Sequence, residues 1–436
     1  MKRKFGLFMI VLLTMSVLFA GGTKESSKTV DSGAEAKPVE IVVAWWGAQT
    51  RNDKFIACFD RYMDLNPNVV IETQINGFSD HMVALSASAA SGTLPDVSMS
   101  QAAYLAQYVD AGLFLDFTPY IESGKLDASS ISKNVLDTGK IGNGIYGITA
   151  GVNAPCVVYN KSLTDSLGIT VKDYMTMDEF IDICRMINQK TGIKTYLTND
   201  PTYIEFLVRA EGKVLYEENR LGVDSYEELL PYFELIVTGN KEGWIIDPTL
   251  VVSVNAIEEY PIANYTTPNT QSWCATINSN QLLSVASVIP AGIELGITTR
   301  PSSNAEKSNY LRQSMCWTVA ANSPKVQEAV KFVDWLTNSE EANAIIAGEP
   351  GVPASSKMAN YLGTIVGPTE KQIMNFITNV VTPKASPGNP NAPANATRIE
   401  NGLILELDEQ IKYGVISAEQ AAKTLFTKGN ELMLEN

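Results

Sequence analysis

Several predicted turns of this sequence carry an aromatic ring beside amide or charged side chains. Trp46 is followed by Gln49 and Arg51, and Trp273 is followed by Asn280. The flat face of an indole packs well against the apolar C–H face of a pyranose ring, and amides and charged groups can hydrogen-bond the ring's hydroxyls. These residue types at this spacing therefore suit the binding of a sugar.

The candidate binding residues lie at or beside predicted corners, where a strand gives way to a turn or a helix. For any single aromatic residue, burial in a core is more common than ligand binding. Burial therefore stays open as the alternative role of each aromatic candidate. For Trp46 and Trp273, the polar neighbours favour ligand binding over burial in a core. Trp335, on the apolar face of a predicted helix, is interpreted as a core residue. The candidates are Trp45, Trp46, Gln49, Arg51, Phe78, Ser100, Gln101, Tyr104, Asn153, Trp273, Asn280, Trp317, Glu349, Pro350 and Gly351.

Other chemistries find little support in the sequence. Gly142-x-Gly144-x-x-Gly147 has the spacing of a dinucleotide fingerprint, but it precedes an apolar strand instead of opening a helix, so these are interpreted as turn residues. His81 is the only histidine, which argues against a metal site, and no G-x-S-x-G elbow supplies a nucleophile. The 48 acidic residues single out no carboxylate pair for glycoside hydrolysis. We therefore predict no cofactor and no metal.

The stretch from Gly92 to Ile121 predicts a strand and a helix that meet at a polar corner. A turn at Gly92–Pro95 precedes a strand over Asp96–Met99, and helical spacing of apolar residues follows over 102–109. Gly112 is placed to end that helix in the left-handed conformation. The corner between strand and helix holds Ser100, Gln101 and Tyr104.

The rest of the chain alternates strand and helix patterns. A buried strand over Val39–Trp45, an amphipathic helix around residues 55–63 and a strand over Val69–Ile75 follow one another. This alternation favours parallel, doubly wound sheets. Further helix starts are indicated by Ser323 with Pro324 and by capping boxes at 176–179 and 417–420.

The run from Gly92 to Ile121 resembles the signature of the family 1 extracellular solute-binding proteins. It contains Pro95-Asp96-Val97 and then Asp116-Phe117-Thr118-Pro119-Tyr120-Ile121 at the family's spacing. Two departures are Thr149, where the family usually has proline, and Met177, where it usually has tryptophan. Four further matches follow in family order, at 140–160, 176–179, 273–282 and 315–342, and the turn at 348–353 is similar to the family's Gly-Val-Pro loop.

The resemblance implies an α/β, two-lobe periplasmic binding protein type II fold in which the chain crosses between lobes about three times. We expect the first lobe at 39–150 and 318–367 and the second at 151–317 and 368–436. A sugar or oligosaccharide would bind between the lobes and then pass to the permease subunits of an ABC importer. We expect the protein to be a monomer and to have no enzymatic activity. Two alternatives stay open: an exported carbohydrate-active enzyme, and the same fold binding a non-sugar solute such as a polyamine.

Two hypotheses give these residues roles. Gln101, with its neighbours at the polar corner, would contact the ligand. Trp46 and Trp273, in segments that the family assigns to opposite lobes, would clamp a sugar between their indole faces. Glu349 and the backbone of Pro350-Gly351 would close one side of that site.

The N-terminus has the pattern of an export signal. Residues 1–20 combine three basic residues with an apolar core too short to span a bilayer, and residues 21–38 are expected to form a flexible tether. Gly21 stands where lipoproteins have cysteine, so we expect an exported protein, periplasmic or extracytoplasmic, without a lipid anchor. Loss of this segment lowers the net charge from −15 to −18, which argues against nucleic-acid partners.

The five cysteines form no C-x-x-C pair, and we expect buried free thiols.

Overall fold

The computed structural model describes residues 37–197, 202–251, 254, 256–263, 270–390, 392–393 and 395–435. The predicted signal segment, 1–20, and residues 21–36 of the predicted tether lie outside this described part. Within it, no helix is both long enough and apolar enough to cross a membrane. Residues from Pro38 onward form one compact unit with two main β-sheets and a small two-stranded sheet.

The first sheet has five strands in the order β2-β1-β3-β11-β6. β1 pairs in parallel with β2 and β3, whereas β11 runs antiparallel to both β3 and β6. The prediction of wholly parallel sheets is therefore wrong here, because β11 enters this sheet from the end at which the other strands leave it. The strands are β1 (Val39–Trp46), β2 (Val69–Asn76), β3 (Val97–Ser100), β6 (Ile148–Asn153) and β11 (Arg312–Val319).

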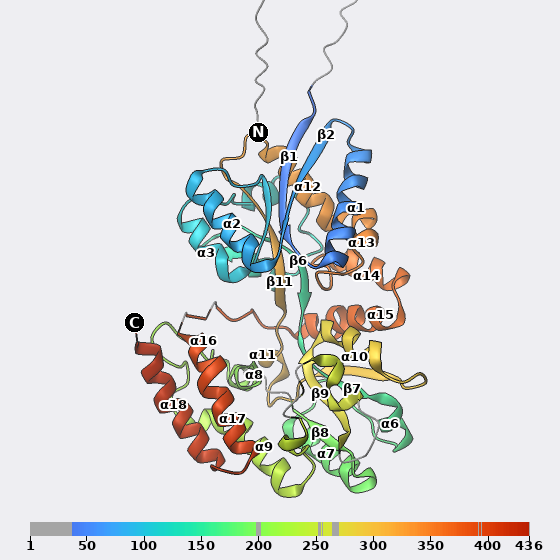
Figure 1. Cartoon of the computed structure of the whole chain (residues 1–436), viewed down its shortest axis with the longest axis vertical. Coiled ribbons are helices and arrows are strands. Elements are labelled where there is room, and N and C mark those ends of the chain that lie inside the picture. The colour runs from blue at the N-terminus through green and yellow to red at the C-terminus, as the bar shows by residue number, and fades with distance from the viewer. Residues whose placement is uncertain are drawn as a thin grey trace, which may run out of the picture. The chain divides into compact units, whose positions relative to one another are not determined.

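Helices cover both faces of the first sheet (Figure 1). On one face, α1 (Gln49–Leu65) and α12 (Val326–Asn338) pack Phe55, Phe59 and Phe332 against Trp317 of β11. On the other face, α2 (Phe78–Ser91) and α3 (Ala102–Asp110) pack apolar side chains around Cys316. Both faces are thus buried, which explains the nearly continuous apolar sequence of β1.

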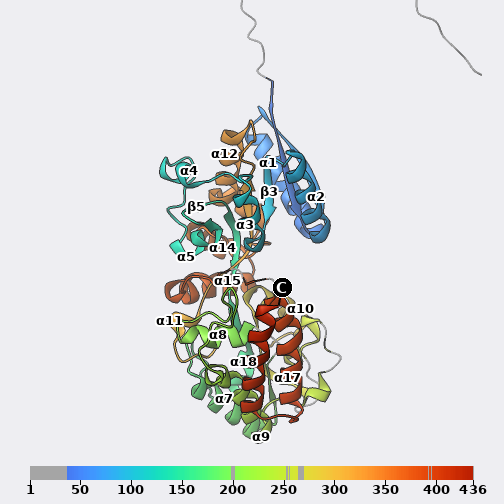
Figure 2. The same ribbon diagram turned by 90° about the vertical axis from the view of Figure 1, so that its left-hand side faces the viewer.

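The second sheet has four strands in the order β10-β7-β9-β8. β9 is antiparallel to β7 and parallel to β8, so this sheet is mixed as well. Helices α7, α8, α9, α17 and α18 pack on one face of this sheet, and α10 and α15 pack on the other. Helices α17 and α18 lie side by side (Figure 2). The elements are β7 (Pro155–Asn160), β8 (Lys194–Tyr196), β9 (Ser272–Asn278), β10 (Leu295–Thr299), α7 (Met177–Thr191), α8 (Thr202–Ala210), α9 (Leu230–Glu242), α10 (Leu282–Val288), α15 (Pro368–Asn375), α17 (Leu405–Lys412) and α18 (Ala418–Leu434).

The chain passes between the two sheets three times. β6 leads directly into β7, β11 returns from the second sheet to the first, and α14 and α15 lead the chain back. The predicted lobe limits at 150/151 and 317/318 lie inside β6 and β11, and the division into lobes stays a prediction. The remaining strands and α-helices are β4 (Lys140–Ile141), β5 (Gly144–Ile145), α4 (Thr118–Glu122), α5 (Lys133–Leu136), α6 (Lys161–Ser166), α11 (Ala305–Ser308), α13 (Glu340–Ile346), α14 (Ser356–Ile365) and α16 (Ala396–Arg398).

Asp96 explains why the first motif carries an aspartate after its proline. Its carboxylate accepts hydrogen bonds from the Val42 backbone N–H at 2.8 Å and from the Ser323 hydroxyl at 2.5 Å, and it pairs with the Lys325 ammonium at 3.3 Å. It therefore joins β1, the start of β3 and the entry to α12. Ser323 was predicted to cap that helix, but α12 begins at Val326, and Ser323 instead accepts from the Lys325 backbone N–H in the preceding turn.

Several local predictions are confirmed. The capping boxes open α7 and α18, and Gly112 adopts φ +69° after α3. Gly142 and Gly144 belong to the turn and second strand of a small hairpin, β4 and β5, instead of a nucleotide-binding loop. All five cysteines are buried free thiols, and burial raises the pKa of Cys156 and of Cys184 to about 12.

Candidate functional site

Trp46 ends β1 and forms an aromatic corner with Phe78, the first residue of α2. Their ring centroids lie 5.4 Å apart in an edge-to-face arrangement, and the His81 ring packs 5.3 Å from the Trp46 ring. Trp46 is 7% exposed, whereas Phe78 is 40% exposed. The exposed face of this corner therefore belongs mainly to Phe78, with Trp46 supporting it.

The polar corner after β3 lies beside the aromatic corner, because β1 and β3 are parallel neighbours whose carboxyl ends meet at the same edge. His81 connects the two corners: its Nε2–H donates to the Met99 carbonyl at 2.8 Å. Gln101 and Tyr104 are half-buried, as a rim position requires. Ser100 is fully buried, and its hydroxyl has no hydrogen-bond partner among the described residues, so a ligand role for Ser100 is not supported by its position.

Trp45 and Trp317 lie in the core, contrary to their prediction as binding residues. Trp45 is 0% exposed, packs edge-on against Phe55 and Phe59, and donates its indole N–H to Asn52 at 3.0 Å. Trp317 is 3% exposed, and its ring centroid lies 5.5 Å from that of Phe55. Successive strand residues face opposite sides of a sheet, so Trp45 faces α1 while Trp46 faces the corner.

The position of Trp273 contradicts the predicted tryptophan clamp. Trp273 is 0% exposed within the core of the second sheet, where its ring packs 5.7 Å from Phe180, and it donates its indole N–H to the Thr195 hydroxyl at 2.8 Å. It is the second residue of β9, five residues before the carboxyl end at Asn278, which corresponds to about 17 Å of strand. The polar residues near it in sequence therefore lie at the far end of the strand.

The turn around Glu349 packs against the strand that connects the two sheets. Arg51 of α1 donates its Nε–H to the Glu349 carboxylate at 2.6 Å and a second N–H to the Trp46 carbonyl at 3.1 Å. Gly351 has φ +130°, and a Cβ there would lie 3.0 Å from the Val152 carbonyl oxygen, so glycine is required. Of the three residues predicted to close the binding site, Pro350 and Gly351 lie against β6, and Glu349 ties the turn to α1.

The other predicted residues lie at scattered positions. Asn153 ends β6, and its side-chain oxygen is buried without a hydrogen-bond partner among the described residues. Gln49 is exposed and donates to Asp53 at 2.6 Å, which leaves it on the outer side of α1. Asn280 is exposed just beyond the carboxyl end of β9. Asn280 is adjacent in sequence to Gln281, which lines the cavity described next.

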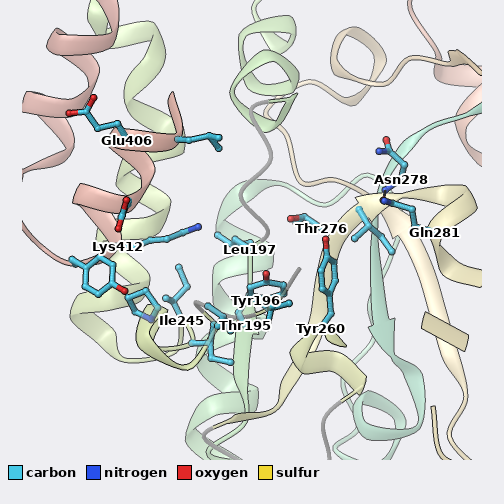
Figure 3. A pocket seen from close by; sticks show the side chains of 18 residues that line it. Thr195, Tyr196, Leu197, Ile245, Tyr260, Thr276, Asn278, Gln281, Glu406 and Lys412 are labelled. Carbon is cyan, nitrogen blue, oxygen red and sulfur yellow. Dashed lines mark hydrogen bonds between the residues drawn. The ribbon is translucent and has the colours of Figure 1, made fainter. Parts of the chain in front are cut away.

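A cavity of about 890 Å³ opens at the carboxyl ends of β8 and β9 (Figure 3). Its volume is in the range of ligand sites, and the carboxyl ends of strands are where open α/β sheets bind ligands. Because β8 and β9 are parallel, Thr195–Leu197 and Thr276–Asn278 meet at this edge. Tyr260 and Gln281 complete this side of the cavity.

Tyr260 supplies aromatic surface in the cavity, and the largely buried Tyr196 lies behind it in the wall. The rings of Tyr196 and Tyr260 meet edge-to-face at 5.3 Å. The buried indole of Trp273 fixes the hydroxyl of Thr195 from behind, so Trp273 supports the cavity wall without reaching the cavity. Gln281 is held by its side-chain oxygen, which accepts from the Asn278 backbone N–H at 2.7 Å.

The opposite wall is formed by α17, which joins the cavity from a distant part of the chain. Figure 3 shows Glu406 and Lys412 on this side, across from Asn278 and Gln281. Lys412 donates to Asp408 at 2.6 Å, and Asp408, only 1% exposed, also accepts from the Tyr232 hydroxyl at 2.6 Å. This buried network fixes the helix face that lines the cavity.

The cavity was missed by the sequence interpretation, although part of its signal was present. The run Asn278-Ser279-Asn280-Gln281 follows an apolar strand and so indicated a polar corner. No comparable pattern marks residues 405–413, because their place in the cavity comes from packing between α17 and the second sheet. The structure thus offers two groups of candidate residues: the corners at the first sheet and the cavity at the second.

Comparison with known proteins identifies relatives for this architecture. A family profile described as "Bacterial extracellular solute-binding protein" matches residues 57–369, which is more than two thirds of the chain. A family 1 extracellular solute-binding protein from Alicyclobacillus acidocaldarius is 22% identical over 92% of this chain and 100% of its own, with a TM-score of 0.83.

Two further solved structures carry the names of sugars. A periplasmic oligogalacturonide-binding protein from Yersinia enterocolitica is 16% identical over 91% of this chain and 99% of its own, with a TM-score of 0.72. A cyclic α-maltosyl-1,6-maltose-binding protein from Arthrobacter globiformis is 18% identical over 92% of this chain and 100% of its own, with a TM-score of 0.69. At these identities the likeness establishes a common fold.

Proposed function

This chain belongs to the bacterial extracellular solute-binding protein family, and we propose that it captures an oligosaccharide outside the cytoplasm and delivers it to the permease of an ABC importer. The fold of the chain is the mixed α/β fold of that family. The sugars named for two of its structural relatives support a carbohydrate ligand over a polyamine.

One observation carries the proposal: the cavity at the carboxyl ends of β8 and β9 combines aromatic rings with amide, hydroxyl and carboxylate groups. Tyr260, supported by the largely buried Tyr196, offers an apolar face for a pyranose ring, and Gln281 and Asn278 offer amides for hydroxyls. Its volume of about 890 Å³ is large for a monosaccharide and suits an oligosaccharide.

Capture would use both sheets. The sugar would first occupy the cavity, and the aromatic corner of Trp46 and Phe78 would then meet it from the first sheet. A ligand that contacts both parts favours the conformation in which both contacts are made. Since the chain crosses between the sheets at β6 and β11, these strands are where such a motion would bend.

A thermal-shift screen against mono- and oligosaccharides tests the proposal, because a ligand that binds only the folded state raises the unfolding midpoint. We expect at least one oligosaccharide to raise the midpoint and to be recovered unchanged after prolonged incubation. Cleavage of that oligosaccharide would identify an exported carbohydrate-active enzyme instead. A midpoint raised by polyamines alone would contradict the sugar ligand.

A further inference from the structure

The α17 wall of the cavity carries two carboxylates that no cation neutralises among the described residues. Glu406 and Glu409 both line the cavity, and their spacing of three residues places them on one helix face. Glu406 accepts from the Gln410 amide at 2.9 Å. The Glu409 side chain has no hydrogen bond or ion pair with the described part of the chain.

The one basic residue on this wall does not neutralise the charges of Glu406 and Glu409. Among the described residues that line the cavity, Lys412 is the one base, and its ammonium pairs with the buried Asp408 at 2.6 Å. Lys412 and the buried Asp408 balance each other, so Glu406 and Glu409 leave the cavity wall of α17 with a net charge of −2. Arg300 is fully buried, donates to the Thr202 hydroxyl at 3.1 Å and to the Ile277 carbonyl at 3.4 Å, and does not itself line the cavity.

We propose that this cavity selects oligosaccharides without carboxylate groups, and that Glu406 and Glu409 are the specificity-determining residues that reject acidic sugars. The inference rests on the proposed function, since it concerns which sugars the same cavity accepts. A uronate placed against α17 would bring its carboxylate toward two uncompensated carboxylates. A neutral sugar would instead donate its hydroxyls to the same oxygens, which ionised carboxylates accept well.

The test is calorimetric titration of the full chain with six trisaccharides, at 20 mM and at 500 mM NaCl. Galactotriose, maltotriose, cellotriose and xylotriose are uncharged, whereas trigalacturonate and trimannuronate are acidic. We expect the tightest ligand to be uncharged. Galactotriose should bind roughly two- to thirtyfold tighter than trigalacturonate, which shares its ring stereochemistry, at low salt. High salt should shrink this ratio, because it screens exposed charges.

A double variant separates charge from shape. E406Q/E409Q keeps the size of both side chains and should reduce discrimination against trigalacturonate severalfold. The control, E218Q/E431Q, changes the net charge equally at two exposed positions that do not line the cavity, and should leave the ratio unchanged.

The possible outcomes distinguish failure of this inference from failure of the proposed function. Tightest binding of an acidic trisaccharide, or unchanged discrimination in E406Q/E409Q, would overturn this inference while leaving the proposed function intact. Absence of binding by all six sugars would contradict the proposed function, and this inference with it.

Discussion

Arg51 and Glu349 form a half-buried ion pair, with 2.6 Å between the guanidinium Nε and a carboxylate oxygen. The pair joins α1 to the turn that packs against β6, the strand through which the chain leaves the first sheet. Glu349 is thereby engaged within the protein, which gives it a structural role, and the ligand contact expected from the sequence stays a prediction.

Replacement of Glu349 by glutamine should therefore lower stability more than it changes binding. Loss of a partly buried, charge-assisted hydrogen bond costs about 1–3 kcal/mol of unfolding free energy. Chemical denaturation measures this, and sugar affinity should stay within about threefold, well under 1.4 kcal/mol. The matched control is Glu341→Gln, which breaks an exposed pair with Arg61 and should change little. A large loss of affinity with unchanged stability would restore Glu349 to the binding site.

Trp273→Ala should destabilise the protein severely. Truncation of a buried aromatic side chain costs about 3–5 kcal/mol because it leaves a cavity in the core. Trp273→Phe retains most of that packing but removes the donor to Thr195, so it should be milder. Unfolding in guanidinium chloride separates the two effects. A stable Trp273→Ala protein would show that the indole is not part of the second-sheet core.

Phe78→Ala should weaken sugar binding with little loss of stability. The ring is 40% exposed at the aromatic corner, and stacking of an exposed aromatic ring on a ligand is worth about 1–3 kcal/mol if nucleobases are a fair guide. The affinity should therefore fall roughly tenfold. Val83→Ala, on the same helix and 69% exposed, is the control expected to have no effect. Equal affinities for Phe78→Ala and wild type would remove this corner from the site.

His81 should make stability depend on pH. Burial lowers its pKa below the usual value, while its hydrogen bond to the Met99 carbonyl partly opposes the shift. The unfolded chain then binds more protons as the pH falls below about 6.5, so the unfolding free energy decreases in that range. His81→Gln should flatten the slope between pH 7 and 5. The comparison is clean because the chain has no other histidine; identical slopes would contradict this explanation.

The sequence predicted the elements well because their signals are local. The period of apolar residues and the caps placed β1, β2 and α3, and Pro95-Asp96-Val97 marked the strand that Asp96 ties to α12. Strand order and direction depend on where the chain returns, and β11 returns antiparallel, which no local pattern encodes.

The candidate site was predicted less well because exposure is a property of packing. Trp45 and Trp46 are adjacent in sequence, yet one faces α1 and the other faces the corner. Trp273 is surrounded by helices that lie far from it in sequence. The same applies to α17, whose Glu406 reaches a cavity built mainly from residues 195–281.

Calorimetric titration of the wild type and of Tyr260→Ala with the best oligosaccharide from the screen tests the central claim most directly. Tyr260 lines the cavity and meets Tyr196 edge-to-face, so its removal takes away aromatic surface at the proposed site. We predict saturable binding to the wild type and affinity roughly tenfold or more weaker in the variant, consistent with 1–3 kcal/mol for an aromatic platform. Equal affinities in the two proteins, or no binding to the wild type, would contradict an oligosaccharide site in this cavity.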